Sequence, residues 1–132
     1  MPMQYSVAIN NARLDSIETV IGTAAILKIY TGAIPANCAA AATGTLLASF
    51  SLPLDYFSAA SAGVKSKLGT WSGSASAAGT AGYARITDSV GTSVGIQGTC
   101  GIGSGDFQMD NTSLAASQVV TVTAFSITAS QV

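Results

Sequence analysis

The sequence predicts an all-β fold: an antiparallel sandwich of two sheets, with about seven to eight strands and a short N-terminal helix. Short apolar runs bounded by Gly, Pro, Asn or Ser recur along the chain, several of them alternate apolar and polar residues, and one segment has helical periodicity. The 132 residues are enough for one domain. We expect residues 1–22 to form an arm and a helix, and residues 23–132 to form the sandwich. Jelly-roll and immunoglobulin-like orders of the strands are both open.

The helix is predicted over residues 11–22, after an arm at residues 1–10. Asn11 can cap its N-terminus and Gly22 can end it. Its apolar residues repeat at helical spacing: Leu14, Ile17 and Ile21.

The strands follow one another at the spacing typical of a sandwich or barrel. They are predicted at residues 25–30, 46–52, 63–71, 83–87, 93–100, 106–110 and 118–128. In the second, Leu46, Ala48, Phe50 and Leu52 fall on one face. The last has apolar residues or Thr on both faces, so we expect it to be covered on both faces or to lie centrally.

The connections carry turn signals. Residues 88–92, with Gly91, are expected to form a hairpin turn. Residues 33–43 and 72–81 are predicted surface loops, and the four alanines at 39–42 could form one helical turn.

The charge content limits the possible functions. Charged residues make up 8% of the chain, against about 25% in ordinary soluble proteins. The net charge is −1 and the five basic residues are dispersed, so direct nucleic-acid binding is not expected. No apolar run has the length of a membrane span, and the N-terminus has no pattern of a secretory signal. The uncharged surface consists largely of short side chains that lose little entropy when covered, which favours a contact surface.

The residues give little support to catalysis, so the protein is not expected to be an enzyme or to need a cofactor. The absence of histidine excludes Ser-His-Asp and Cys-His arrangements and imidazole metal sites. Asp106, Asp110 and Asn111 could offer oxygens to calcium, but their spacing does not match an EF-hand loop. We expect the two aspartates on a solvated stripe, with Phe107 and Met109 facing the core.

Three further sets of side chains have a structural and a functional interpretation. Cys38 and Cys100 permit one disulfide, although two free buried thiols are favoured, and they are too few for zinc. Lys65 and Lys67 share one strand face and could meet an acidic neighbour, although a solvent-facing role that protects a strand edge is favoured. Single aromatic residues in strands most often pack in the core or at its rim, but three could form a sugar platform: Tyr30, Trp71 and Tyr83.

Several segments resemble small structural proteins encoded near the head genes of tailed double-stranded DNA phages. They are LKIYTG (27–32), Pro35-Ala36, TGTLLASFSLP (43–53), GTAGYARITDSVGT (79–92) and GSGDFQMDNTSLAASQVVTVTAFSIT (103–128). The similarity covers about residues 24–128, and its motifs are turn and strand residues rather than catalytic ones. The resemblance implies a virion protein, made in the host cytoplasm, that binds the outside of the capsid as a decoration or cement protein.

Composition and resemblance together predict a homo-oligomeric capsid decoration protein that contacts the major capsid protein and bridges and stabilises neighbouring capsid subunits. The candidate capsid contacts are Leu14, Ile17, Ile21, Lys65 and Lys67. The alternatives are a receptor- or carbohydrate-binding module of a head or tail fibre, and a tail or neck component.

Overall fold

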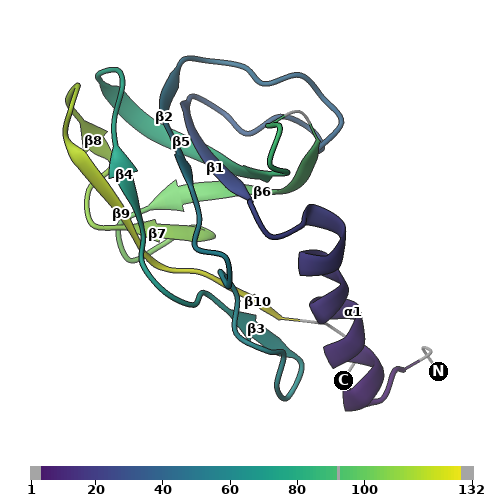
Figure 1. The fold of residues 1–132 in the computed structure, drawn as a ribbon. Coiled ribbons are helices and arrows are strands. Elements are labelled where there is room, and N and C mark those ends of the chain that lie inside the picture. The colour runs from purple at the N-terminus through teal and green to yellow at the C-terminus, as the bar shows by residue number, and fades with distance from the viewer. Residues whose placement is uncertain (1–3, 92, 129–132) are drawn as a thin grey trace.

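The computed structural model describes residues 4–91 and 93–128, which form one helix, α1 (Val7–Ile21), followed by ten strands (Figure 1). The strands are β1 (Ile26–Thr31), β2 (Leu46–Ser51), β3 (Val64–Ser66), β4 (Trp71–Ser74), β5 (Gly79–Thr87), β6 (Val94–Gly101), β7 (Phe107–Met109), β8 (Ser113–Leu114), β9 (Val119–Ala124) and β10 (Ser126–Thr128). The prediction of a mostly β fold with a short N-terminal helix is confirmed.

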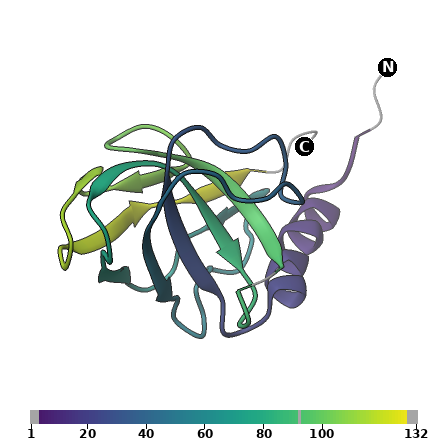
Figure 2. The same cartoon turned by 90° about the horizontal axis from the view of Figure 1, so that it is seen from above.

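Most strands belong to one curved sheet, in the order β2-β1-β5-β6-β7-β9-β4 (Figures 1 and 2). β8 pairs with β5, while β10 and β3 form a separate two-stranded sheet. The two ends of the curved sheet meet, because Ala48 of β2 forms a bridge with Ala75 and the Ser76 N–H donates to the Leu47 carbonyl at 2.7 Å. The sheet is therefore nearly closed. A division into two sheets is not clearly shown, and the jelly-roll and immunoglobulin-like alternatives stay predictions.

The core fills the inside of this curved sheet. Aromatic rings pack against one another within it: the Phe107 and Phe125 centroids are 4.4 Å apart and the Trp71 and Phe125 centroids are 5.7 Å apart. Aliphatic side chains that are fully buried complete it, among them Leu27, Ile29, Leu47, Ile86, Val120 and Val122. Burying each such side chain stabilises the fold by about 1.5–3 kcal/mol relative to leaving it exposed.

The helix begins earlier than predicted. Ser6, not Asn11, is the N-cap, and its hydroxyl accepts a hydrogen bond from the Ile9 N–H. Asn11 is used differently, since its side-chain oxygen accepts from the Gly63 N–H just before β3. This tertiary contact outweighs the weak helix propensity of asparagine. The end of the helix at Gly22 is confirmed, with φ of 95°; of the predicted arm, residues 1–3 lie outside the described residues and residues 7–10 are helical.

The largest error in the strand prediction lies in a segment of Gly, Ser, Ala and Thr, whose Gly and Ser residues are typical of loops but which here forms parts of two strands. The predicted loop at residues 72–81 is wrong, because β4 runs to Ser74 and β5 begins at Gly79. Gly73 lies under the Phe50 ring, and a Cβ at this position would stand 2.5 Å from the Phe50 Cβ. The single strand predicted at residues 63–71 is instead β3 followed by a connection that ends at the first residue of β4, and the one predicted at residues 118–128 is divided into β9 and β10.

The remaining connections agree with the sequence. The Asp88 turn joins β5 to β6, and Gly91 has φ of 82°. Residues 33–43 form a loop without the possible helical turn; Asn37 organises it, because its side-chain oxygen accepts from the Ala39 and Ala40 N–H groups.

Two face assignments change because of sheet geometry. A bulge in the β1–β2 pairing turns Leu47 into the core and leaves Leu46 exposed, whereas Ala48 and Leu52, which the alternation places on the same face as Leu46, are buried. β9 lies centrally between β7 and β4, as one of the two predicted arrangements. Only one of its faces is buried, with Val120 and Val122 inside.

Candidate functional site

An ion-pair cluster joins the helix to the sheet. The Lys65 ammonium on β3 lies 2.7 Å from the Asp15 carboxylate and 2.7 Å from the Glu18 carboxylate, both on α1, and also donates to the Ser58 carbonyl at 3.0 Å. Lys65 is 1% exposed. The i, i+3 spacing of the two acids places them on one face of the helix, a signal in the sequence that could have predicted a shared cation.

The cluster favours the charged forms of Asp15 and Lys65. The hydrogen bond from Lys65, followed by that from the Ala60 N–H, lowers the pKa of Asp15 below its ordinary value. Burial acts to lower the pKa of Lys65, but its hydrogen bonds to Asp15 and Glu18 outweigh burial and raise the pKa above its ordinary value. The cluster is therefore an ionic latch that holds α1 against β3, and we call it the helix latch.

The five predicted contact residues lie mostly against the protein's own sheet. Leu14 and Ile21 are buried and Ile17 is half-buried. The solvent-facing interpretation of Lys65 is wrong, because the helix latch covers it. Lys67 is half-buried, and its ammonium donates to the Gly69 carbonyl at 2.7 Å. Contact of these residues with a capsid stays a prediction, but little of Leu14, Ile21 or Lys65 is open to a partner.

The three aromatic residues do not form an exposed platform. Trp71 and Tyr83 are fully buried, and the rings of Tyr30 and Tyr83 stack with centroids 5.1 Å apart. The Trp71 indole N–H donates to the Leu68 carbonyl. The Tyr83 hydroxyl donates to the Thr43 carbonyl and accepts from the Thr43 N–H. Core packing, the favoured interpretation, therefore describes Trp71 and Tyr83.

A buried arginine, which sequence reasoning missed, attaches the loop at residues 33–43. Arg85 is 4% exposed and donates to the carbonyls of Asn37 and Ala40 and to the side-chain oxygen of Gln97. Gln97 in turn donates to the Pro35 carbonyl at 2.9 Å. All these acceptors are neutral, so Arg85 serves to order the loop. The sequence does hold a signal of this role, because Arg85 is the one charged residue of the strand segment YARIT, residues 83–87.

The two aspartates that flank β7 accept hydrogen bonds from nearby strands. Asp106 accepts from the Thr99 N–H and hydroxyl, and Asp110 accepts from the Thr121 N–H. Phe107 and Met109 are buried as predicted, with the two aspartates exposed. Among the described residues, no group of three or more His, Cys, Asp or Glu is placed to hold a metal ion.

Both cysteines are free and half-buried. Burial, followed by the charge of Asp106, raises the pKa of the Cys100 thiol to about 12. Because the thiolate is the nucleophilic form, this raised pKa disfavours reaction of Cys100 at neutral pH.

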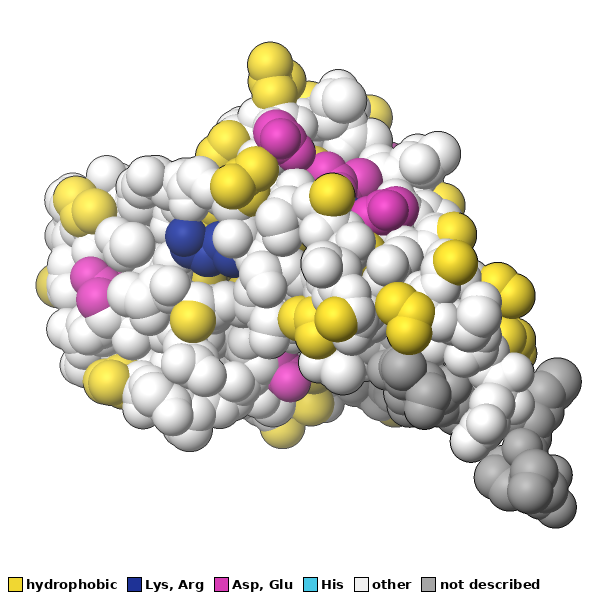
Figure 3. Space-filling model, turned by 90° about the horizontal axis from the view of Figure 1, so that it is seen from below, with side chains coloured by type: hydrophobic (Ala, Val, Ile, Leu, Met, Phe, Trp, Pro, Cys, Tyr) yellow, Lys and Arg dark blue, Asp and Glu magenta, His cyan; other side chains and the backbone are white. Residues whose placement is uncertain are grey.

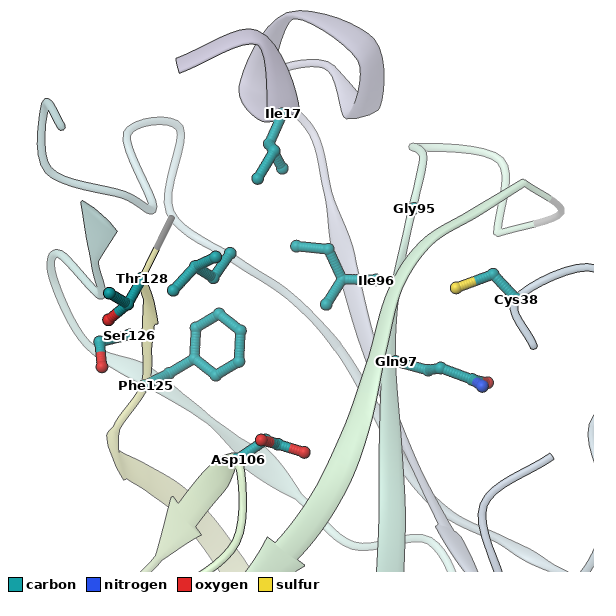
Figure 4. A pocket seen from close by; sticks show the side chains of 10 residues that line it. Ile17, Cys38, Gly95, Ile96, Gln97, Asp106, Phe125, Ser126 and Thr128 are labelled. Atoms are coloured by element: carbon teal, nitrogen blue, oxygen red, sulfur yellow. The ribbon is translucent and has the colours of Figure 1, made fainter. Parts of the chain in front are cut away.

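An open groove of about 490 Å³ lies between β6 and β10 (Figure 4). Ile17 of α1 points into it from above, Ile96 and Phe125 face it from opposite sides, and Asp106 stands at its lower end. The side chain of Gln97 points to the other side of the β6 ribbon, away from the groove. The groove is the place where the nearly closed sheet is open, because β7 pairs with only the last two residues of β6.

The rest of the surface is poor in charge and carries scattered apolar side chains. On the face in Figure 3, hydrophobic side chains stand singly or in small groups, and a few acidic side chains and one basic group lie between them. Ten large hydrophobic residues are exposed in the described part of the chain: Val7, Ile9, Val20, Ile34, Leu46, Leu54, Leu68, Val90, Ile102 and Val119. They come from the helix, the strands and the loops, so apolar area is spread over several sides.

Comparisons with protein-family models, with curated proteins and with solved structures found no match. In the described part of the chain, no helix has the length and hydropathy of a membrane span. A functional proposal must therefore be argued from the surface, the groove and the sequence resemblance.

Proposed function

We propose that the chain is a structural protein of a tailed-phage virion, and that it binds the outside of the capsid as a decoration protein. Its partner is the major capsid protein, and many copies bind one shell. The resemblance of residues 24–128 to small phage structural proteins supports the virion as the location. The protein acts by binding, without catalysis or a cofactor.

The observation that carries the proposal is a surface with very few free charges and widespread apolar side chains. Of the five basic residues, only Arg13 is exposed. Lys65 and Arg85 are buried, and Lys28 and Lys67 are half-buried. Exposed Val20, Val90 and Leu54 are each at least 75% accessible. Such a surface is inexpensive to cover with another protein, because little charge must be desolvated.

Binding of this kind stabilises a shell through mass action. A protein that binds only the assembled state lowers the free energy of that state, by about 2.7 kcal/mol per site when its free concentration is 100 times Kd. Repeated over every equivalent site of a closed shell, modest contributions add up. The proposed result is a head that better resists internal pressure from packaged DNA.

The carbohydrate-binding alternative has less support. A sugar site of this type needs exposed aromatic faces, and Trp71 and Tyr83 are fully buried. A tail or neck location would use the same kind of surface, so localisation on the particle separates it from the capsid.

The test is to mix the purified protein with undecorated heads of the phage that encodes it. We expect the protein to sediment with the heads and to raise the temperature at which they break. Heads that already carry the protein serve as the control and should take up no more. Failure to sediment, or an unchanged breakage temperature, contradicts the proposal. Because few charges are exposed, binding should also change little between low and moderate salt.

A further inference from the structure

The side of β6 that faces the groove is an open strand edge. On its other side, β6 pairs with β5 from Val94 to Thr99. On the groove side, β7 pairs with β6 only at Cys100 and Gly101. The described residues therefore contain no strand that pairs with the groove side of β6 between residues 94 and 99.

Backbone polar groups of β6 point into this opening. The Thr99 N–H donates to the Asp106 carboxylate at 3.0 Å, away from β5. Because successive N–H and C=O groups of a strand point to alternate sides, those of Gln97 point to the same side as those of Thr99. The backbone N–H and C=O groups of Gln97 therefore point into the groove.

The opposite wall presents a second edge of the same kind. β10 pairs with β3, and the Lys67 N–H donates to the Phe125 carbonyl at 2.8 Å. By the same alternation, the backbone groups of Ser126 and Thr128 point away from β3, toward the groove. Two strand edges thus face each other across one opening.

The residues that line the groove indicate what kind of polypeptide segment would fit into it. Ile17, Ile96 and Phe125 supply apolar contacts, and Asp106 is the one charged side chain among the described residues that line the groove. The β6 segment SVGIQGTC has no Lys and no Pro, the residues that commonly protect a free edge from pairing. A matching segment would be extended and mostly apolar, with an aliphatic side chain for the groove and a single basic residue opposite Asp106.

We propose that this opening, which we call the β6–β10 seam, binds an extended segment of the major capsid protein as an added strand. The segment would pair with β6 and β10 and close the sheet, as in other cases where a peptide adds a strand to an exposed edge. This inference rests on the proposed function, since it takes the capsid subunit as the partner.

A pair of matched variants tests it. Ser126→Lys with Thr128→Lys places two long charged side chains at the β10 edge, where both native residues are exposed. The control is Ser74→Lys with Thr80→Lys, at exposed positions of β4 and β5. Binding to undecorated heads is measured by sedimentation, and folding of both variants is checked by circular dichroism. We expect the control to bind like the wild type and the seam variant to bind at least tenfold more weakly.

Hydrogen exchange of the wild-type protein gives a second readout. The Gln97 amide, which points to the groove and faces no partner strand among the described residues, should exchange at least tenfold more slowly when the protein is on heads. Equal binding of the seam variant and the control overturns the inference and leaves the proposed function standing. Loss of wild-type binding overturns both. If the Gln97 amide becomes protected in the protein alone as its concentration rises, a second copy of this chain fills the seam, and the capsid segment is excluded as the occupant.

Discussion

Replacing Lys65 by Met should destabilise the protein strongly, because the change keeps most of the buried stem and removes the ammonium from the helix latch. That ammonium makes three hydrogen bonds, to Asp15, Glu18 and the Ser58 carbonyl. Removing one partner from a buried ion pair costs about 3–5 kcal/mol. The Asp15 and Glu18 side chains are 48% and 27% exposed, so water solvates them after the change and reduces the cost. We expect a loss of about 3 kcal/mol in the free energy of unfolding.

The assay is urea unfolding followed by the fluorescence of Trp71, the one tryptophan of the chain. With a urea m value of about 1–3 kcal/mol/M, a loss of about 3 kcal/mol lowers the midpoint by about 1–3 M. Lys67→Met is the control, because the residue is only half-buried and, among the described residues, its ammonium donates a hydrogen bond only to the Gly69 carbonyl, at an exposed position. It should lose less than about 1 kcal/mol. If both variants lose the same free energy, the helix latch does not stabilise the fold.

The pH dependence of stability should carry the same signature. The pKa of Asp15 is lowered in the folded protein, so its contribution is present above its ordinary pKa of 3.8 and is lost as the pH falls through the folded value. The pKa of Lys65 is raised, so its contribution is present below its ordinary pKa of 10.5 and is lost as the pH rises through the folded value. Lys65→Met should flatten the urea midpoint against pH at both ends. An unchanged pH profile would refute the pairing.

Three further outcomes follow from the core and the thiols. Phe125→Ala should lower the free energy of unfolding by about 3–5 kcal/mol in the same urea assay, since the ring is stacked within the core; a loss below about 1 kcal/mol would contradict its position. Gly73→Ala should cost about 1–3 kcal/mol because the new Cβ overlaps Phe50, and a neutral result would show that the ring is elsewhere. In a Cys38→Ser variant, iodoacetamide should modify Cys100 slowly at pH 8 and faster in urea, as measured by mass spectrometry; equal rates would contradict the raised pKa of Cys100.

Local features of the fold could be read from the sequence because they depend on neighbouring residues. Gly22 ends the helix and Gly91 shapes the β5–β6 turn, since both need a positive φ. The alternation around Phe107 and Met109 placed their side chains in the core. These signals lie within a few residues of the feature that they predict.

Features that depend on distant pairing could not be read in this way. The β1–β2 bulge that buries Leu47 arises from the register between two strands. The Gly and Ser residues of β4 have low strand propensity, and their partner β9 lies almost fifty positions away in the chain. Lys65 looks like an edge residue until α1 is placed beside β3.

The candidate site was the hardest part to predict. Composition indicated a contact surface, but the named contact residues turned out to pack largely against the protein itself. The β6–β10 seam depends on where the sheet stays open, which follows from the short pairing of β7 with β6. No local pattern in residues 93–100 or 126–128 shows that two edges face each other.

Cryo-electron microscopy of the intact virion is the most direct test of the central claim, that this charge-poor surface is covered by capsid protein. The account predicts density for this chain on the outside of the head, with its apolar surface and the β6–β10 seam against capsid subunits. Purified particles that lack the chain, or that carry it on the tail, would contradict it.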